Sequence, residues 1–445
     1  MGNYFGTDGI RGVAASDFPP DRVLLFGQAI GRFLHENYPT EEIWVGIGKD
    51  TRLSGDLIES SLIAGLLSMG VNVKSLGILP TPAIARLTMM EKCQAGIVIS
   101  ASHNPLEYNG IKIFSAQGTK FSDQQEQRIE YWIEQAKLGL PVSQHPGIHR
   151  IFQDAPSAYA QSIIRQYPKL KLNGLKVAID CAYGATFWTS PHVLEHLGAK
   201  VLPVAAVPDG SLINVNCGST YPEYVEEAAR LKKFAYDVAF THDGDGDRVL
   251  TRYQGTLVDG DHLITMIGLH RQHEHQLNPS MIVGTVMTNS GIELFLNERQ
   301  IKLHRSKVGD RYVLEDMIKY KALIGGEQSG HLIFLDKTST GDGLVSILES
   351  LDAMIASDFQ LMRDVQQIPL HSQVLLNVKV SDKEAVLQSS LFLNEIEQIK
   401  KNHPEVRLVI RPSGTEPLFR ILTEALDSSL AKHLAEHLAN LAASI

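Results

Sequence analysis

The sequence predicts a protein of several domains: three similar α/β units with mostly parallel mixed sheets, followed by a smaller α+β unit. Three observations carry this prediction. The chain has 445 residues, which at about 150 residues per domain suggests about three domains. A pattern of strand, polar loop, helix and strand recurs three times. After Pro369 this pattern gives way to that of a small α+β unit.

Each repeat joins two β-branched strands through a helix with apolar residues at 3.6-residue spacing. Helices of this kind bury the faces of a parallel sheet. In the first copy the helix ends before Gly70, which suits a helix C-cap. A single large doubly wound sheet would show the same periodicity. The strand pairs are expected at 43–47 and 71–73, at 175–179 and 199–202, and at 281–283 and 301–303.

Turn formers cluster near residues 140–150, and further breaks fall near residue 250 and at Pro369. The expected domains are therefore 1–150, 151–250, 251–368 and 369–445. In the last of them we expect strands at 374–380, 406–410 and 418–423, and helices at 382–399 and 430–441.

Composition and charge exclude several classes of protein. Hydrophobic residues make up 44% and charged residues 20%, which excludes a disordered chain. The net charge is −9 and no basic run is present, so nucleic acid is not an expected partner. No apolar run approaches the ~18 residues that span a bilayer, so no membrane attachment is expected. Only three scattered cysteines (Cys93, Cys181 and Cys217) are present, which favours a reducing compartment, the cytoplasm.

The sharpest chemical signal is the segment Asp243-Gly244-Asp245-Gly246-Asp247-Arg248, which lies between apolar strands at 238–240 and 249–250. Glycines let the three carboxylates turn onto one point, where they need a cation. Carboxylate oxygens suit Mg²⁺ or Ca²⁺. An EF-hand is excluded, because its sixth and twelfth positions would hold Arg248 and Gln254. A solvated acidic turn is the alternative.

The segment Ser100-Ala101-Ser102-His103-Asn104-Pro105 follows an apolar strand at 96–99 and precedes an expected turn at Asn109-Gly110. Loops at the carboxyl ends of strands hold ligands in open α/β sheets, so Ser102 is a candidate nucleophile. A serine that caps a turn is the alternative. The Gly-x-Ser-x-Gly elbow of hydrolases is not present here.

Two further glycine-containing loops carry polar groups. Residues 411–417, with Arg420 following, offer guanidinium groups, hydroxyls and backbone N–H groups to a phosphate, or form an ordinary hairpin turn. Residues 325–331 place Glu327, Ser329 and His331 at alternating positions. Alternation would put them on one side, which suits a polyhydroxyl ligand, and a glycine-rich turn is the alternative.

Isolated charges and histidines are weaker signals. Arg11 lies in a glycine-rich loop and Lys112 follows the expected Asn109-Gly110 turn, and each alone reads as a surface charge. The histidines show no metal-ligand spacing. We expect His35, His242 and the histidines at 270–275 on solvated faces.

Taken together and in order, these segments resemble the α-D-phosphohexomutase family. The resemblance covers nearly the whole chain. Six ordered matches make chance agreement negligible, although each short motif alone is weak. The motifs are GTDGIRG at 6–12, SASHNP at 100–105 with NGIK at 109–112, DGDGDR at 243–248, VGDRYV at 308–313, GGEQSGH at 325–331 and RPSGTEP at 411–417.

The resemblance implies four domains around a central active-site cleft. It implies that Ser102 carries a phosphoryl group as phosphoserine and that Ser102, Asp243, Asp245 and Asp247 bind one Mg²⁺. Glu327 and Ser329 would contact sugar hydroxyls. Arg411, Ser413, Gly414, Thr415 and Arg420 would hold the non-reacting phosphate. The remaining groups of the reaction centre would be Arg11, His103, Lys112, Arg248 and His331, with Lys112 and His331 transferring protons.

The implied enzyme is an isomerase that interconverts glucosamine 6-phosphate and glucosamine 1-phosphate through a hexosamine bisphosphate, on the route to UDP-N-acetylglucosamine. Gln328 and the residues of the RPSGTEP motif favour glucosamine as the sugar of the substrate. A phosphomannomutase or phosphoglucomutase is the alternative within the family, and a sugar-phosphate-binding protein without turnover is the alternative outside it. The expected partner is a small phosphosugar.

Overall fold

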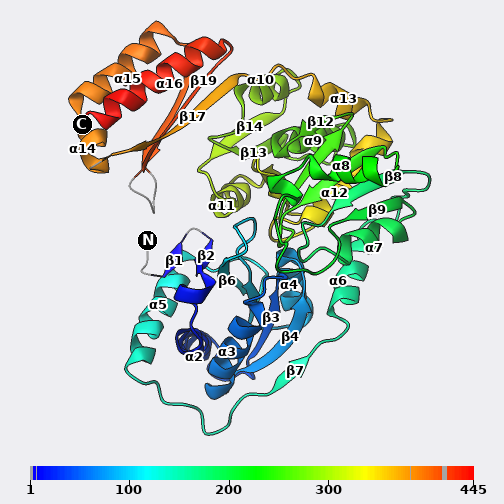
Figure 1. The fold of residues 1–445 in the computed structure, drawn as a ribbon, viewed down its shortest axis with the longest axis vertical. Coiled ribbons are helices and arrows are strands. Elements are labelled where there is room, and N and C mark those ends of the chain that lie inside the picture. The colour runs from blue at the N-terminus through cyan, green and yellow to red at the C-terminus, as the bar shows by residue number, and fades with distance from the viewer. Residues whose placement is uncertain (1–3, 7, 381, 413–417) are drawn as a thin grey trace.

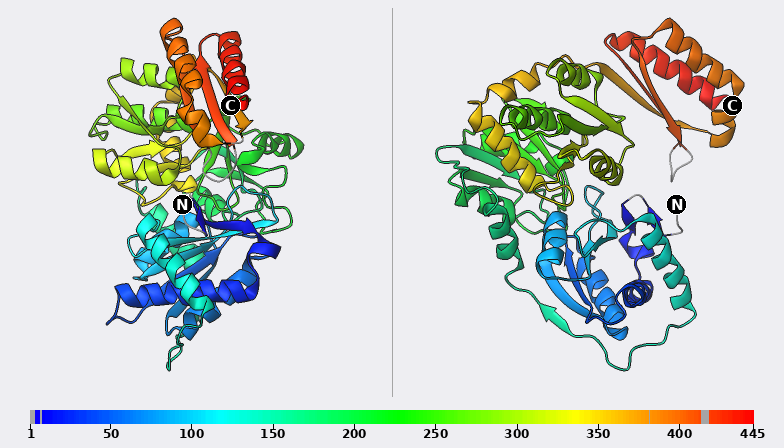
Figure 2. Two further views of the ribbon diagram at one scale, coloured as in Figure 1. Left: turned by 90° about the vertical axis from the view of Figure 1, so that its left-hand side faces the viewer. Right: turned by 180° about the vertical axis from the view of Figure 1, so that it is seen from behind.

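Four units follow one another around an open arc, with the N-terminal unit at one end and the C-terminal unit at the other (Figures 1 and 2). This computed structural model describes residues 4–6, 8–380, 382–412 and 418–445. Four units, the last of them smaller, confirm the predicted architecture. Their arrangement around a central cleft stays a prediction.

The first unit is a seven-stranded mixed sheet in the order β1-β2-β6-β5-β3-β4-β7. Helices α2, α3 and α5 cover one face, and α4 covers the other. The strands are β1 (Phe5–Gly6), β2 (Gly9–Val13), β3 (Trp44–Lys49), β4 (Asn72–Ile78), β5 (Ala95–Ile99), β6 (Tyr108–Ser115) and β7 (His149–Ile151). The helices are α1 (Ala14–Asp17), α2 (Pro20–Asn37), α3 (Gly55–Ser68), α4 (Thr81–Met90) and α5 (Asp123–Lys137).

The second unit has a five-stranded sheet in the order β12-β11-β10-β8-β9. Its strands are β8 (Lys176–Asp180), β9 (Lys200–Val204), β10 (Val238–His242), β11 (Val249–Tyr253) and β12 (Thr256–Val258). Its helices are α6 (Ala155–Ile164), α7 (Thr189–His196), the short η1 (Gly218–Thr220) and α8 (Tyr224–Leu231).

The third unit has a four-stranded sheet in the order β14-β13-β15-β16. Its strands are β13 (Met281–Thr285), β14 (Lys302–Ser306), β15 (Ile324–Gly326) and β16 (Leu332–Phe334). Its helices are α9 (Gly260–His273), α10 (Ser290–Glu298), α11 (Asp310–Tyr320), α12 (Gly343–Ala356) and α13 (Gln360–Gln366).

The sheets of the first three units share the same central arrangement of strands, which confirms the predicted repeat. In each, the first strand of the repeat lies between the second and the third, and both neighbours are parallel to it. A fourth strand pairs antiparallel with the third: β6 with β5, β11 with β10, and β16 with β15. Gly70 has a φ of +80° after α3, as expected of a C-cap.

The fourth unit is an antiparallel three-stranded sheet covered by helices, and it has a core of its own. The predicted helix at 382–399 is wrong in one respect. It is broken at Ser389, whose hydroxyl accepts from the Phe392 amide and caps a second helix. The elements are β17 (Ser372–Lys379), α14 (Lys383–Gln388), α15 (Ser390–Asn402), β18 (Arg407–Pro412), β19 (Leu418–Ala425) and α16 (Ser428–Ala443).

The expected turn at Asn109-Gly110 is also wrong, because both residues lie inside β6. Gly110 is needed for packing: a Cβ there would lie 2.6 Å from the Ser100 carbonyl oxygen and 2.8 Å from that of Ile10. Arg11 likewise lies on a strand, β2, and not in a loop.

One apolar core runs through the second and third units and includes the α4 side of the first. Helix α6 packs against both α4 and α7, so it joins the first unit to the second. Within the described residues, no helix is long and apolar enough to cross a bilayer. We keep the domain limits 1–150, 151–250, 251–368 and 369–445 as a proposal.

Candidate active site

Ser102 lies in the loop that leaves the carboxyl end of β5, where a ligand-binding loop was predicted. Its side chain is buried, with 1% of the residue exposed. Its hydroxyl donates to Asp243 Oδ2 at 2.5 Å and lies 3.3 Å from His103 Nδ1. The candidate nucleophile of the first unit therefore touches the acidic loop of the second.

The acidic loop between β10 and β11 gathers three buried carboxylates. Asp243, Asp245 and Asp247 offer oxygen atoms within 4.8 Å of one another. Burial and the charges of Asp247 and Asp245 raise the pKa of Asp243 well above its ordinary value. Oδ1 of Asp245 and Oδ1 of Asp247 are buried without a hydrogen-bond partner in the described part of the chain. These unsatisfied oxygens and the like-charge repulsion fit a divalent cation.

Lys112 is the cation closest to these carboxylates. Its Nζ donates to Asp245 Oδ2 at 2.9 Å and lies 3.2 Å from Asp8 Oδ2. It is no surface charge, because only 1% of its side chain is exposed. Burial alone would lower the pKa of Lys112, but Asp245, Asp8 and Asp247 together raise it above its ordinary value. Lys112 is therefore held as a cation.

His331 lies between two carboxylates from different units. Its Nδ1 is 3.6 Å from Asp247 Oδ1 and its Nε2 is 3.5 Å from Asp310 Oδ2. Burial lowers the pKa of His331, but Asp247 and Asp310 outweigh it and raise the pKa. Lys120 Nζ donates to Asp310 Oδ2 at 2.5 Å and also to Asp8.

Sequence reasoning missed Asp8, Lys120 and Asp310. Two of them had a signal, since Asp8 lies in GTDGIRG and Asp310 in VGDRYV, the motifs on which the resemblance rests. Nothing local marks Lys120. Its importance comes from ion pairs to the first and the third unit, which only the tertiary structure brings together.

Arg11, Arg248 and His103 are the other residues predicted for the candidate site that lie at this cluster. Arg11 donates to Asp8 and, through Nη1, to Asn104 Oδ1 at 3.1 Å. Arg248 Nε lies 3.8 Å from Asp247 Oδ1. Burial and the charges of Arg248 and Arg11 lower the pKa of His103 to about 4, so its imidazole is neutral at pH 7.

His242, expected on a solvated face, is buried at the end of β10. Its ring nitrogens lie 3.0 Å from Ser190 Oγ and 3.0 Å from the Arg248 carbonyl oxygen. Burial lowers its pKa to about 4. The neutral His242 thus supports the acidic loop through its contact with the Arg248 carbonyl oxygen.

The segment with Glu327 and Ser329 forms a turn between β15 and β16, so the strand alternation expected there is wrong. Gly330, with a φ of +91°, takes part in this turn. Glu327 Oε1 accepts from the Gly309 amide at 2.9 Å, and Ser329 is exposed. Only His331 of this segment points into the carboxylate cluster.

Arg411 and Arg420 lie opposite each other on β18 and β19. Burial and the charge of Arg420 lower the pKa of the Arg411 guanidinium. Two adjacent cations of this kind favour an anion between them. Ser413, Gly414 and Thr415, predicted with them, lie outside the described residues.

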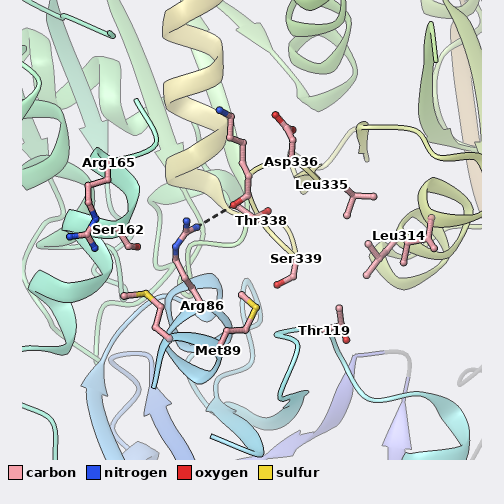
Figure 3. Close-up of a pocket in the computed structure, with 13 residues that line it drawn as sticks. Arg86, Met89, Thr119, Ser162, Arg165, Leu314, Leu335, Asp336, Thr338 and Ser339 are labelled. Carbon is pink, nitrogen blue, oxygen red and sulfur yellow. Dashed lines mark hydrogen bonds between the residues drawn. The ribbon is translucent and has the colours of Figure 1, made fainter. Parts of the chain in front are cut away.

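A cavity of about 590 Å³ lies elsewhere, at the junction of α4, the end of α6, α11 and the loop at 335–339 (Figure 3). Arg86 Nη1 donates to the Lys337 carbonyl oxygen at its wall, at 3.3 Å. None of the predicted site residues that the structure describes lines this cavity. The serine loop and the carboxylate cluster therefore lie outside this cavity.

Models of one known protein family match most of the chain. Four models of phosphoglucomutase/phosphomannomutase domains match: alpha/beta/alpha domain I at residues 2–139, domain II at 157–254, domain III at 259–369 and the C-terminal domain at 375–441. The chain belongs to the phosphoglucomutase/phosphomannomutase family, which confirms the resemblance predicted from the motifs.

The chain is similar over nearly its whole length to individual phosphoglucosamine mutases. The chain is 43% identical to a phosphoglucosamine mutase of Carboxydothermus hydrogenoformans over 98% of both chains. It is 44% identical to that of Methylobacillus flagellatus over 98% of this chain and 97% of the relative. Among solved structures, a phosphoglucomutase/phosphomannomutase family protein from Burkholderia thailandensis aligns with a TM-score of 0.81 and 22% identity, covering 99% of this chain and 97% of that one.

Proposed function

We propose that this protein interconverts glucosamine 6-phosphate and glucosamine 1-phosphate. The name of its relatives, phosphoglucosamine mutase, supports this reaction. The observation that carries the proposal is the 2.5 Å hydrogen bond from Ser102 Oγ to Asp243, which supports Ser102 as a nucleophile beside the carboxylate cluster. A phosphoserine at Ser102 would hold the transferable group.

The proposed cofactor is one Mg²⁺, held by Asp243, Asp245, Asp247 and the oxygen of Ser102. The two buried carboxylate oxygens that accept no hydrogen bond within the described residues support this assignment. A relative in fold, the N-acetylphosphoglucosamine mutase of Aspergillus fumigatus, was solved in complex with GlcNAc-6P and magnesium; it is 16% identical, with a TM-score of 0.66 over 99% of this chain and 95% of that one. When bound, the ion would neutralise negative charge on the phosphoryl group.

Charge balance supports the proposed roles of the surrounding cations. Three aspartates contribute about −3, a phosphoserine about −2 and the ion about +2, which leaves about −3. Arg11, Lys112 and Arg248 offset this remainder. Phosphoryl transfer depends mainly on positioning and charge stabilisation, and these residues supply both.

In the proposed reaction the O–P bond at Ser102 breaks while a new bond forms to the free sugar hydroxyl. The hydroxyl proton leaves to a protein group, and the product is a hexosamine bisphosphate. The intermediate then turns around, and its other phosphoryl group passes to Ser102 Oγ. The O–P bond to the sugar breaks, the freed sugar oxygen takes a proton from a protein group, and phosphoserine is restored. Lys112 and His331 are the proposed proton-transfer groups. Lys112 enters the reaction protonated, because its neighbours hold it as a cation.

The C-terminal unit is proposed to hold the non-reacting phosphate through Arg411 and Arg420, with Ser413, Gly414 and Thr415. This cradle must accept either end of the sugar, since the bisphosphate reverses between the two steps. Glu327 and Ser329 are the proposed contacts to the sugar hydroxyls.

Replacing Arg420 by Ala tests this cradle. Loss of a charge-assisted contact of about 1.5–3 kcal/mol should lower kcat/KM by roughly ten- to a hundredfold. The variant should still carry phosphate on Ser102 and should release more bisphosphate, because recapture of the opposite end is weakened. Steady-state kinetics and analysis of released sugar phosphates measure both effects. Lys432→Ala removes an exposed cation of the same unit and is the control. Wild-type kinetics in Arg420→Ala would refute the cradle.

Substrate identity is tested by comparing kcat/KM for glucosamine 6-phosphate with the values for glucose and mannose phosphates. We expect the amino sugar to be preferred. A thousandfold preference for either of the others would instead identify a phosphoglucomutase or phosphomannomutase, the second candidate, which shares the serine, the acidic loop and the arginine cradle.

The proposed partner is a small phosphosugar, with no nucleic acid or membrane, and the proposed compartment is the cytoplasm. The three cysteines, all buried free thiols, support a reducing compartment. The remaining alternative, a binding protein without turnover, predicts no phosphate on Ser102 even after incubation with a hexose bisphosphate. Intact-mass measurement decides between the two.

A further inference from the structure

Ser102 has an unusual backbone. Its φ is +52°, in the left-handed region that residues with a side chain rarely adopt. Strained conformations of this kind persist where surrounding contacts fix them, and they cluster at functional sites.

On its carbonyl side, the loop is held by a fully buried guanidinium. Arg52 follows β3, and none of its side chain is exposed. Nη2 donates to the carbonyl oxygens of Ser102 at 2.9 Å and Asn104 at 2.8 Å. Nη1 donates to those of Pro105 at 2.6 Å and Tyr108 at 2.9 Å. With Nε on Asp50 at 3.0 Å, all five N–H donors of the guanidinium are used.

On its amide side, Ser102 depends on the same ion pair. Its N–H donates to Ser100 Oγ at 2.9 Å, and Ser100 Oγ donates to Asp50 Oδ2 at 2.6 Å. Asp50 Oδ2 also accepts from Arg52 Nε. Both peptide groups that flank Ser102 thus lead back to the buried Asp50–Arg52 pair.

A second donor reaches the same carbonyl from another unit. Asn214, in the loop after β9, donates from Nδ2 to the Ser102 carbonyl oxygen at 2.9 Å. The acidic loop packs at this point as well, since a Cβ on Gly244 would lie 2.9 Å from the Ser102 oxygen and 2.8 Å from Asn214 Nδ2. The Ser102 carbonyl is therefore where the serine loop and the acidic loop are fixed to each other.

We propose that Arg52 and Asn214 are positioning residues, which hold Ser102 in its left-handed conformation and so aim its hydroxyl at the acidic loop. The proposal rests on the proposed role of Ser102 as phosphoryl carrier. Arg52 acts only through the loop, because each of its donors is already bonded to protein oxygens. Because Asn214 belongs to the second unit, the orientation of the Ser102 hydroxyl depends on contact between the first two units.

The principal test is Asn214→Ala, with Asn216→Ala as the matched control. Both asparagines lie in the same loop with left-handed backbones, at φ +58° and +51°, so both variants lose the same backbone preference. Asn216 is exposed, and within the described residues its side chain makes no hydrogen bond. Any difference between the variants therefore reports the bonds from Asn214 Nδ2 to the serine loop, at 2.9 Å to the Ser102 carbonyl oxygen and at 3.5 Å to that of Asn104.

Asn214→Ala should lower kcat and the rate at which Ser102 takes phosphate from a hexose bisphosphate, each on the order of tenfold, because small misplacements of a reacting group are costly. KM for the sugar phosphate should stay unchanged, since Asn214 does not contact substrate in this scheme. Tm should match that of Asn216→Ala. A purely structural role would lower Tm without separating kcat from KM.

Arg52→Lys is the second variant. It keeps the charge at this position but cannot reproduce a five-donor fork, so we expect a larger fall in the phosphorylation rate, on the order of a hundredfold. If it fails to fold, Asn214→Ala still decides.

The positioning role alone would be overturned if Asn214→Ala kept the phosphorylation rate and kcat of the wild type. This conclusion requires that the wild type and Asn216→Ala both take up phosphate. If wild type itself takes up no phosphate on Ser102, the proposed function fails, and this inference fails with it.

Discussion

Ser102→Ala is expected to lower turnover on the order of 10⁴-fold or more, the scale seen when an enzyme loses its nucleophile. Without Oγ no oxygen remains at this position to receive the phosphoryl group. The fold should be retained, because the contacts that hold this loop use the Ser102 amide and carbonyl and not its side chain. Kinetics and intact mass, before and after incubation with a hexose bisphosphate, measure the result.

The control is Ser157→Ala, which removes an exposed hydroxyl on α6. It should keep both turnover and the added mass of about one phosphate. Phosphate uptake by Ser102→Ala equal to that of wild type would move the phosphorylation site to another residue.

Asp245→Asn is the second change with a large expected effect. Asp245 Oδ2 accepts from Lys112 Nζ at 2.9 Å and from Thr81 Oγ1 at 2.6 Å, while Oδ1 is buried and accepts no hydrogen bond in the part of the chain that the structure describes. Removing this charge weakens a hard-cation site and leaves Lys112 less well paired. We expect turnover to fall roughly a hundredfold or more and the Mg²⁺ concentration for half-maximal activity to rise at least about tenfold.

Turnover measured against free Mg²⁺ checks this expectation. Asp154→Asn is the control, since Asp154 is exposed and its side chain does not cap the helix that follows it. Unchanged activity of Asp245→Asn at limiting Mg²⁺ would remove the metal assignment. The fold should survive, because Gly244 and Gly246 still shape the loop backbone.

The repeats were predictable because their strands and helices carry their own periodicity. Errors arose where tertiary packing decides. An Asn-Gly pair is typical of a turn, yet both residues lie in β6, which pairs with β2 and β5. The glycine is needed there because carbonyl oxygens of Ser100 and Ile10 leave no room for a side chain. Ser389 interrupts a periodic helix by capping its second half, which periodicity alone does not reveal.

The candidate site divides in the same way. Residues inside short sequence motifs, such as Ser102 and Asp243, could be predicted because the motif itself is local. Lys120 could not, since the partner that explains it, Asp310, lies 190 residues away. Arg52 and Asn214 were missed for a related reason: they bond to backbone carbonyl groups, which every residue has, so no residue pattern marks the partner.

The packing of α6 against α4 bears on how this chain can be cut into fragments. A fragment that ended at residue 150 would lack α6, which packs against α4, and would remove the second- and third-unit part of the apolar core that includes the α4 side of the first unit. Such a piece would tend to self-associate in water. The C-terminal unit differs, because its core is drawn entirely from residues 374–445. A stable N-terminal fragment must therefore extend past residue 164, whereas the last unit can be separated at the start of β17 with its core intact.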